Sequence, residues 1–275
     1  MKKVIVPIDF SGDSINALEH AIVIANIIKA DVRMIHVKKN KNFEIPFYFK
    51  DFDYSHGDTL QDYFEIIFKK YRSKVENKFD YKIREGHVFK EVCNQAKYDD
   101  AYMVIMGTHG ISGFEELIAG SNAFKTVANS VCPVLTVRHG FLRTEITKIV
   151  LPIDVSKESR QKVPFVTELA SYFNAEIHTV SVREMNSKDI ITKLEKYTAQ
   201  VCEYISKKNV KCYTQALNGN NITDITIEYA NKIGAELISI MTEQSENPAN
   251  IVLGAYAQQM VNHSPIPVLC IHPHS

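Results

Sequence analysis

Several features are scarce or missing in this 275-residue sequence, and each absence excludes a class of protein. No apolar run approaches the roughly 18 residues that a membrane-spanning helix needs, so we expect no membrane partner. Lys and Arg together number 32, as do Asp and Glu, and this balance lacks the basic excess of a nucleic-acid-binding surface. Residues 1–9 hold too short an apolar stretch for a secretory signal, so a cytoplasmic location is expected.

Disulfide and metal chemistry are disfavoured by the cysteine pattern. The sequence has five cysteines, an odd number, and no Cys-x-x-Cys pair. They stand at positions 93, 132, 202, 212 and 270. Buried free thiols in a reducing compartment are therefore expected, in place of a disulfide framework or a metal site.

What the sequence does contain is an internal duplication. Three segments of the first half recur in the second half: residues 4–11 with 149–156, 31–37 with 176–182, and 131–137 with 265–271. The first two pairs are 145 positions apart and the last pair 134, so the first half carries about 11 additional residues in its middle. The sequence thus predicts one domain in residues 1–140 and a second in residues 146–275.

Each half alternates short apolar runs with stretches of helical periodicity. The runs that predict strands are residues 2–8, 31–37, 80–85, 101–106 and 133–137, and then 148–153, 175–182, 210–216, 236–241 and 267–271. Strands that are apolar on both faces and alternate with helices form parallel sheets covered by helices on either side. We therefore expect an α/β protein with two tandem, doubly wound, Rossmann-like sheets of five parallel strands, each in the order 3-2-1-4-5.

Ligand-binding residues are expected after the first and fourth strands, where the winding direction of such a sheet reverses. Asp9 follows the first strand, and Gly107 and Gly110 follow the fourth. Glycine permits positive φ and lets an anion approach main-chain N–H groups. Nine residues later, Gly120-Ser121-Asn122 opens a helix whose free amides and positive dipole end favour a phosphate. Asp9 would repel phosphates and therefore suits a base edge or a ribose.

The spacing of these residues resembles that of the universal stress protein family. Its nucleotide-binding members carry Gly-x2-Gly-x9-Gly-Ser/Thr after the fourth strand and an aspartate after the first. Gly107, Gly110, Gly120 and Ser121 match this pattern position by position. The resemblance covers nearly the whole chain, because each half looks like one such domain, and it implies an adenine nucleotide alpha hydrolase-like fold.

The resemblance also implies a ligand and a role for each matching residue. The ligand is ATP, with a divalent ion such as Mg²⁺ or Mn²⁺ bridging its phosphates. Asp9 would contact adenine and Val37 would line the base pocket. The glycine loop with Ser121 and Asn122 would hold the ribose and the phosphates.

The second half departs from the motif. The positions of Gly107, Gly110 and Ser121 are occupied by Met241, Gln244 and Ala255, although Gly254 keeps the place of Gly120. The side chains of Met241 and Gln244 lie where phosphate would bind, and Glu243 and Glu246 add negative charge to the same loop. We therefore expect no triphosphate there. Asp154 matches Asp9, and its simplest role is to cap a helix that starts near Ser156.

The leading functional hypothesis is a cytoplasmic stress-response or regulatory protein that binds ATP, or another adenine nucleotide, in the first domain only. One alternative is an interaction scaffold that needs no nucleotide and recruits a protein partner of unknown identity. The other is a slow ATPase, but no positioned general base is evident, so neither enzymatic activity nor a catalytic residue is expected. No metal-binding residues are predicted.

Other candidate residues have simpler explanations. His109 lies inside the glycine loop without an identifiable carboxylate partner, and His36 and His178 are expected to pack on strands. The aromatic-rich segment 43–54 is either a packed loop or a lid and protein contact near the nucleotide.

The last strand of each half is short and apolar and is expected at a sheet edge. In the family that the chain resembles, such strands pair between subunits. The two halves are therefore expected to pair with each other as an internal pseudo-dimer, and a homodimer of the whole chain remains an alternative.

Overall fold

Strands and helices alternate along the whole chain. The computed structural model describes residues 1–38, 59–108, 120–138, 140–183, 187–242 and 253–273. The first half contains β1 (Lys3–Pro7), α1 (Gly12–Ile28), β2 (Asp31–Lys38), α2 (Leu60–Tyr71), β3 (Phe79–Glu85), α3 (Val88–Tyr98), β4 (Met103–Gly107), α4 (Ser121–Asn129) and β5 (Val134–Val137). The second contains β6 (Lys148–Pro152), α5 (Val163–Phe173), β7 (Glu176–Arg183), α6 (Lys188–Lys207), β8 (Cys212–Asn218), α7 (Ile222–Ile233), β9 (Leu237–Met241), α8 (Ala255–His263) and β10 (Val268–Ile271).

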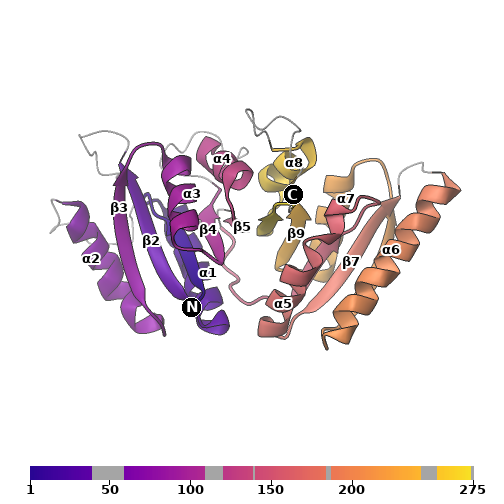
Figure 1. Ribbon diagram of the computed structural model, residues 1–275, viewed down its shortest axis with the longest axis horizontal. Coiled ribbons are helices and arrows are strands. Elements are labelled where there is room, and N and C mark those ends of the chain that lie inside the picture. The colour runs from indigo at the N-terminus through magenta and orange to yellow at the C-terminus, as the bar shows by residue number, and fades with distance from the viewer. Residues whose placement is uncertain (39–58, 109–119, 139, 184–186, 243–252, 274–275) are drawn as a thin grey trace.

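All ten of these strands belong to one sheet, in the order β3-β2-β1-β4-β5-β10-β9-β6-β7-β8. Within each half the strands are parallel and follow the expected order, and the arrows of β2 and β7 rise toward the same side of the molecule (Figure 1). The expectation of two separate sheets is corrected, because β5 and β10 pair antiparallel.

The junction between the halves is short. Leu135 lies opposite Leu269, and the Thr136 hydroxyl donates to the Val268 carbonyl over 3.2 Å. Without this pairing, β5 and β10 would each leave an unpaired apolar edge, which folded proteins normally cover. The two halves therefore cover each other's edges, which is the pairing expected of an internal pseudo-dimer.

Two helical layers sandwich the sheet. Side chains alternate along each strand, so Val4 and Val6 of β1 enter one core while Ile5 enters the other. The first core receives α1, α2, α5 and α6, and the second receives α3, α4, α7 and α8. Each core draws residues from both halves of the chain. The halves therefore share their hydrophobic interior.

The helix that follows the first strand differs between the halves. Ser11 caps α1 by accepting a hydrogen bond from the Ser14 N–H over 3.2 Å. In the second half the expected helix start near Ser156 is wrong. A short 3₁₀ helix, Glu158–Arg160, comes first, and α5 begins only at Val163.

A partly buried ionic network ties β2 to its neighbours in the first half. The Arg33 guanidinium donates to both carboxylate oxygens of Asp80, at 2.6 and 2.7 Å, and to both of Asp99, at 2.7 and 2.8 Å. Asp99 also accepts from Lys3 over 3.0 Å. Bidentate geometry of this kind compensates the cost of desolvating the charges.

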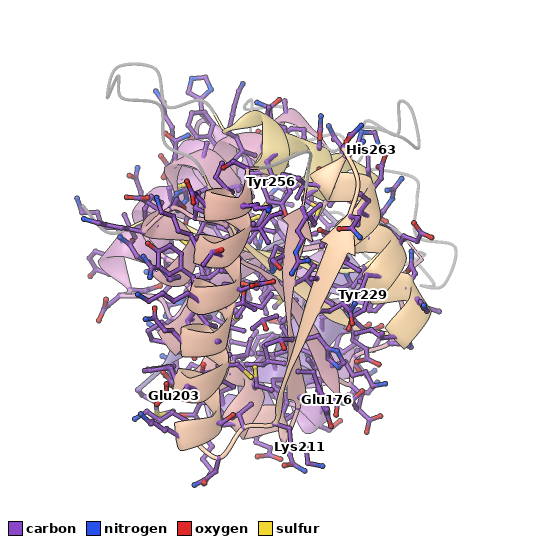
Figure 2. All side chains as sticks on the ribbon, turned by 90° about the vertical axis from the view of Figure 1, so that its right-hand side faces the viewer. Glu176, Glu203, Lys211, Tyr229, Tyr256 and His263 are labelled. Atoms are coloured by element: carbon purple, nitrogen blue, oxygen red, sulfur yellow. The ribbon has the colours of Figure 1, made fainter. Side chains whose placement is uncertain are left out.

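His178 takes the place of Arg33 in the second half and packs, as its strand position predicts. Its Nδ1 lies 2.9 Å from the Tyr229 hydroxyl, and its Nε2 lies 3.1 Å from Glu176. The ring also stacks on Tyr213, with 5.0 Å between centroids. Figure 2 shows Glu176 and Tyr229 on the side of the molecule formed by the second half.

The thiols and the helices of the structure bear on two of the sequence expectations. All five cysteines are free thiols, but only Cys132 and Cys270 are buried, whereas Cys93, Cys202 and Cys212 are partly exposed. Among the helices that the structure describes, none is long and apolar enough to cross a bilayer.

Candidate functional site

The predicted site residues lie at one edge of the sheet. β1 pairs with β2 on one side and with β4 on the other, so the carboxyl ends of all three strands are neighbours. Asp9 follows β1, Val37 is 8% exposed near the end of β2, and Gly107 ends β4. This edge is the point where the winding direction reverses, as the sequence predicts.

A tight turn holds Asp9 in place. Its Oδ1 accepts hydrogen bonds from the Ser11 N–H over 3.0 Å and from the Ser11 hydroxyl over 2.6 Å. Between them, Phe10 adopts φ 66°, a left-handed conformation that costs a non-glycine residue roughly 1–2 kcal/mol. The Phe10 side chain is 1% exposed and packs on Phe64, with 5.2 Å between the ring centroids. Burial of this ring offsets the strain, which fixes the direction of the Asp9 carboxylate.

His36 lies beneath this turn. Its Nδ1 is 2.7 Å from the Ile8 carbonyl oxygen, and its ring centroid is 5.0 Å from that of Phe10. Burial lowers the pKa of His36 below its ordinary value, although the bond to Ile8 opposes the effect. His36 therefore acts as a packed core residue, as its strand position predicts.

Gly107 is needed for packing, and not for the positive φ that the sequence analysis expected. A Cβ atom at this position would lie 3.0 Å from both the Cβ and the carbonyl oxygen of Asp13 in the first turn of α1. Its φ is outside the left-handed region that Gly86, Gly140, Gly219 and Gly234 occupy. Glycine therefore lets α1 begin directly against the end of β4.

The start of α4 is held against the same strand end. The Gly120 N–H donates to the Thr108 carbonyl over 2.6 Å, and Gly120 is the N-cap of α4. Ser121 and Asn122 are the first two residues of the helix, and N–H groups at these positions have no acceptor inside the helix. The positive end of the α4 dipole is thus available beside the end of β4.

Some predicted residues lie outside the described part of the chain. They are Gly110 and His109 in the first half, the aromatic segment 43–54, and Glu243, Gln244 and Glu246 in the second half. The glycine loop is therefore described by its two ends, Thr108 and Gly120.

The second half has a different arrangement at the corresponding edge. Met241 replaces Gly107 and is 8% exposed. Asp154 accepts from the Ser156 N–H over 2.6 Å, so it closes a turn and caps no α-helix. Lys162 is 2% exposed and donates to the Ser159 carbonyl over 2.6 Å. Burial lowers the pKa of Lys162 to about 7, opposed in part by Asp154.

Three residues at these edges were missed by the sequence analysis. Asp13 is 7% exposed and contacts the place where a Gly107 side chain would be, and its position in the first helical turn is a signal for it. Thr108 is 3% exposed and anchors Gly120. Lys162 could have been noticed because its counterpart 145 positions earlier is Ala17.

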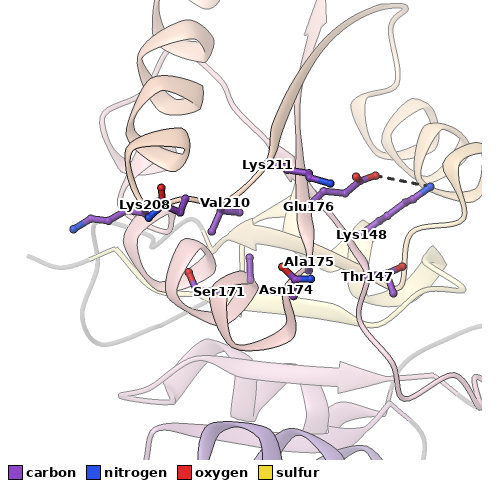
Figure 3. Close-up of a pocket in the computed structure, with 11 residues that line it drawn as sticks. Thr147, Lys148, Ser171, Asn174, Ala175, Glu176, Lys208, Val210 and Lys211 are labelled. Carbon is purple, nitrogen blue, oxygen red and sulfur yellow. Dashed lines mark ion pairs between the residues drawn. The ribbon is translucent and has the colours of Figure 1, made fainter.

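A separate cavity of about 470 Å³ lies at the opposite edge of the second half, near the amino ends of β6, β7 and β8 (Figure 3). Its charged lining residues include Lys148, Lys208 and Glu176. Lys148 donates to the Ile233 carbonyl at the end of α7 over 3.1 Å and lies 3.9 Å from Glu176, while Lys208 caps the end of α6. Lysines at helix carboxyl ends stabilise the helix dipole, which accounts for them without a ligand.

Within the part of the chain that the structure describes, no group of three or more His, Cys, Asp or Glu side chains is arranged to hold a metal ion.

Comparison with known proteins gives the same family for both halves. The profile of the universal stress protein family matches residues 1–138 and again residues 145–272. Universal stress protein MJ0531 of Methanocaldococcus jannaschii is 31% identical over 143 residues, which cover 50% of this chain and 82% of that protein. Universal stress protein YxiE of Bacillus subtilis is 26% identical over 147 residues, covering 50% and 98%.

The overall fold also has a solved counterpart. The crystal structure of a universal stress protein from Archaeoglobus fulgidus aligns with a TM-score of 0.72 over 98% of both chains, at 16% identity. The duplicated sequence, the two halves joined in one sheet and the two matches to one family profile show the family. The chain belongs to the universal stress protein family, as a tandem, two-domain member.

Proposed function

We propose that this chain is a cytoplasmic stress-response or regulatory protein that binds an adenine nucleotide, ATP in the first instance, in its first half only. The observation that carries the proposal is the contact between Gly120 and Thr108. It holds the amino end of α4 at the end of β4, one strand away from the turn that orients Asp9. An anion-attracting helix end beside a fixed carboxylate suits the two chemically different ends of a nucleotide.

The residues present fit the parts of such a ligand. The N–H groups of Ser121 and Asn122, with the Ser121 hydroxyl, can donate to phosphate oxygens. Asp9 can accept from the adenine amino group or a ribose hydroxyl, and Val37 offers an apolar contact at the end of β2. A Mg²⁺ or Mn²⁺ ion, when bound, would neutralise charge on the phosphates.

The single-site part of the proposal depends on how the halves differ. Ala255 has no hydroxyl at the start of α8, and Met241 stands where Gly107 admits α1. The buried Lys162 already occupies space near Asp154. Residues 1–140 and 146–275 remain the proposed limits of the competent and the degenerate domain.

Calorimetric titration with ATP and Mg²⁺ tests the proposal, with an expected stoichiometry of one per chain. Ser121→Asp places a carboxylate where a phosphate would lie and should weaken ATP binding at least about 100-fold, because like charges in close contact cost several kcal/mol. Ala255→Asp is the matched control. Both residues are exposed first residues of helices, so aspartate is favourable to both folds and only the first change should affect binding.

Two results would contradict the single-site proposal. One is a stoichiometry near two, and the other is a loss of binding in Ala255→Asp with normal binding in Ser121→Asp. Hydrolysis is expected to be slow or undetectable, and phosphate release that disappears in Ser121→Asp would assign turnover to this same site.

A further inference from the structure

The two outer strands of the sheet, β3 and β8, differ in how they are protected. Each pairs with one described strand only, β3 with β2 and β8 with β7. In Figure 2, β8 rises from the labelled Lys211 between the helix that carries Glu203 and the helix that carries Tyr229, with its outer edge toward the viewer. An open edge of this kind invites pairing with another strand unless something opposes it.

The outward-facing backbone groups of β8 can be identified from its bonds to β7. The Ile177 N–H donates to the Lys211 carbonyl, and the Gly219 N–H donates to the Arg183 carbonyl. In a regular parallel ladder, alternate residues bond to the same neighbour, so the odd-numbered residues of β8 face β7. The N–H and C=O groups that point away from the sheet belong to Cys212, Thr214, Ala216 and Asn218.

β3 carries charges that oppose edge pairing, and β8 has none. The equivalent registers on β2 and β7 align the two outer strands residue by residue. The four charged residues of β3 and their counterparts on β8 are Asp80 with Tyr213, Lys82 with Gln215, Arg84 with Leu217, and Glu85 with Asn218. Each charged position of β3 therefore has an uncharged counterpart on β8. Charged residues on an edge strand commonly prevent association with other strands.

Exposed apolar side chains are also more numerous on β8 and its neighbours in the chain. Large hydrophobic side chains that are at least one-third exposed occur on β8 and on the helices that precede and follow it: Ile190 and Tyr204 on α6, Tyr213 on β8, and Ile222 on α7. Around β3, the corresponding elements α2, β3 and α3 contribute Tyr98 alone among their described residues. Exposed apolar groups gathered at one place mark contact surfaces more often than isolated ones do.

We propose that β8 is the docking edge for a second copy of this chain, paired antiparallel about Gln215. In that register Thr214 faces Ala216 of the second copy and Cys212 faces Asn218. All four outward-facing residues then exchange backbone hydrogen bonds, and the Gln215 side-chain amide, which donates to the Ala216 carbonyl over 3.1 Å, turns away or shares that acceptor. Tyr213 then lies opposite Leu217, and Gln215 lies opposite its own copy. The same register on β3 would place Lys82 against Lys82, which charge repulsion disfavours. The contact is isologous and therefore stops at a dimer.

Sedimentation velocity of the full chain, from micromolar to near-millimolar concentration, tests the proposal. The unmodified protein should sediment as a dimer at the upper concentrations. Gln215→Lys and Gln215→Glu each place like charges at the two-fold axis and should weaken self-association at least about tenfold. An equimolar mixture of the two variants should recover the dimer, because opposite charges then face each other.

The control is Lys82→Glu, a charge change at the equivalent position of the other outer strand, which should leave association unchanged. Circular dichroism melting checks that every variant is folded. A wild-type protein that stays monomeric would leave β8 to some other occupant and overturn the proposal. A dimer that persists in both charged variants, or a mixture that fails to associate, would overturn it as well.

Discussion

Replacing Lys162 with methionine is expected to stabilise the folded chain, and more so in acid than in alkali. The amine is 2% exposed and, within the part of the chain that the structure describes, donates to the Ser159 carbonyl alone. Burial lowers its pKa from an ordinary 10.5 to about 7, with Asp154 opposing part of the effect. At about 1.4 kcal/mol for each tenfold change in proton affinity, the buried charge lowers the unfolding free energy by roughly 5 kcal/mol at low pH.

The sign follows from which state binds the proton. Between pH 7 and 10.5 the unfolded lysine is protonated and the folded one is neutral, so the wild-type protein gains stability as the pH rises through this window. Below pH 7 the penalty is complete. Lys162→Met removes it, so the variant should exceed the wild type by about 5 kcal/mol at pH 6 and by about 2 kcal/mol at pH 9. The lost hydrogen bond to Ser159 costs only about 1 kcal/mol.

Urea unfolding followed by circular dichroism at these two pH values gives the difference directly. Lys157→Met is the matched control, since Lys157 is an exposed lysine of the same segment, and it should change the unfolding free energy by less than about 0.5 kcal/mol. The reasoning would be refuted by a Lys162→Met protein that is less stable than wild type at pH 6. It would also be refuted by a stability difference that is equal at pH 6 and pH 9.

Two further changes probe the first half. Gly107→Ala should destabilise the nucleotide-free protein by about 1–3 kcal/mol in thermal denaturation, because its Cβ would lie 3.0 Å from Asp13. If it lowered ATP affinity alone, the packing explanation would be wrong. Arg33→Met should cost about 3–5 kcal/mol in urea unfolding, because it leaves Asp80 and the buried Asp99 without their main partner. A change below about 1 kcal/mol would contradict the role given to this network.

The layered fold follows from local sequence pattern, which is why most of it could be predicted. The apolar run at 31–37 became β2, Asp31–Lys38, and its alternating side chains supply both cores. The pairing of β5 with β10, which joins the two halves into one sheet, does not follow from local pattern. It depends on three residue pairs that join strands more than 130 positions apart, which no periodicity encodes.

The candidate site was predictable where residue type and chain position suffice. Asp9 and Gly120 lie at strand and helix ends, where a parallel sheet places its ligands. The reason for Gly107 was not predictable, because it arises from the close approach of α1 to β4. The late start of α5 was also missed, because the short 3₁₀ helix Glu158–Arg160 precedes it, although the turn between Asp154 and Ser156 repeats the one between Asp9 and Ser11.

The antiparallel joint between β5 and β10 has a consequence for how another molecule can approach the chain. Because the sheet twists on either side of the joint, both halves turn the carboxyl ends of their strands toward one side (Figure 1). A molecule that binds on that side contacts two halves of similar backbone shape and different chemistry, with a serine hydroxyl at the start of α4 and an alanine methyl at the start of α8. Two identical subunits would bind such a molecule equally well in either of two orientations. Because the two halves of this chain differ, the two orientations are no longer equivalent, so duplication followed by divergence makes binding to this side directional.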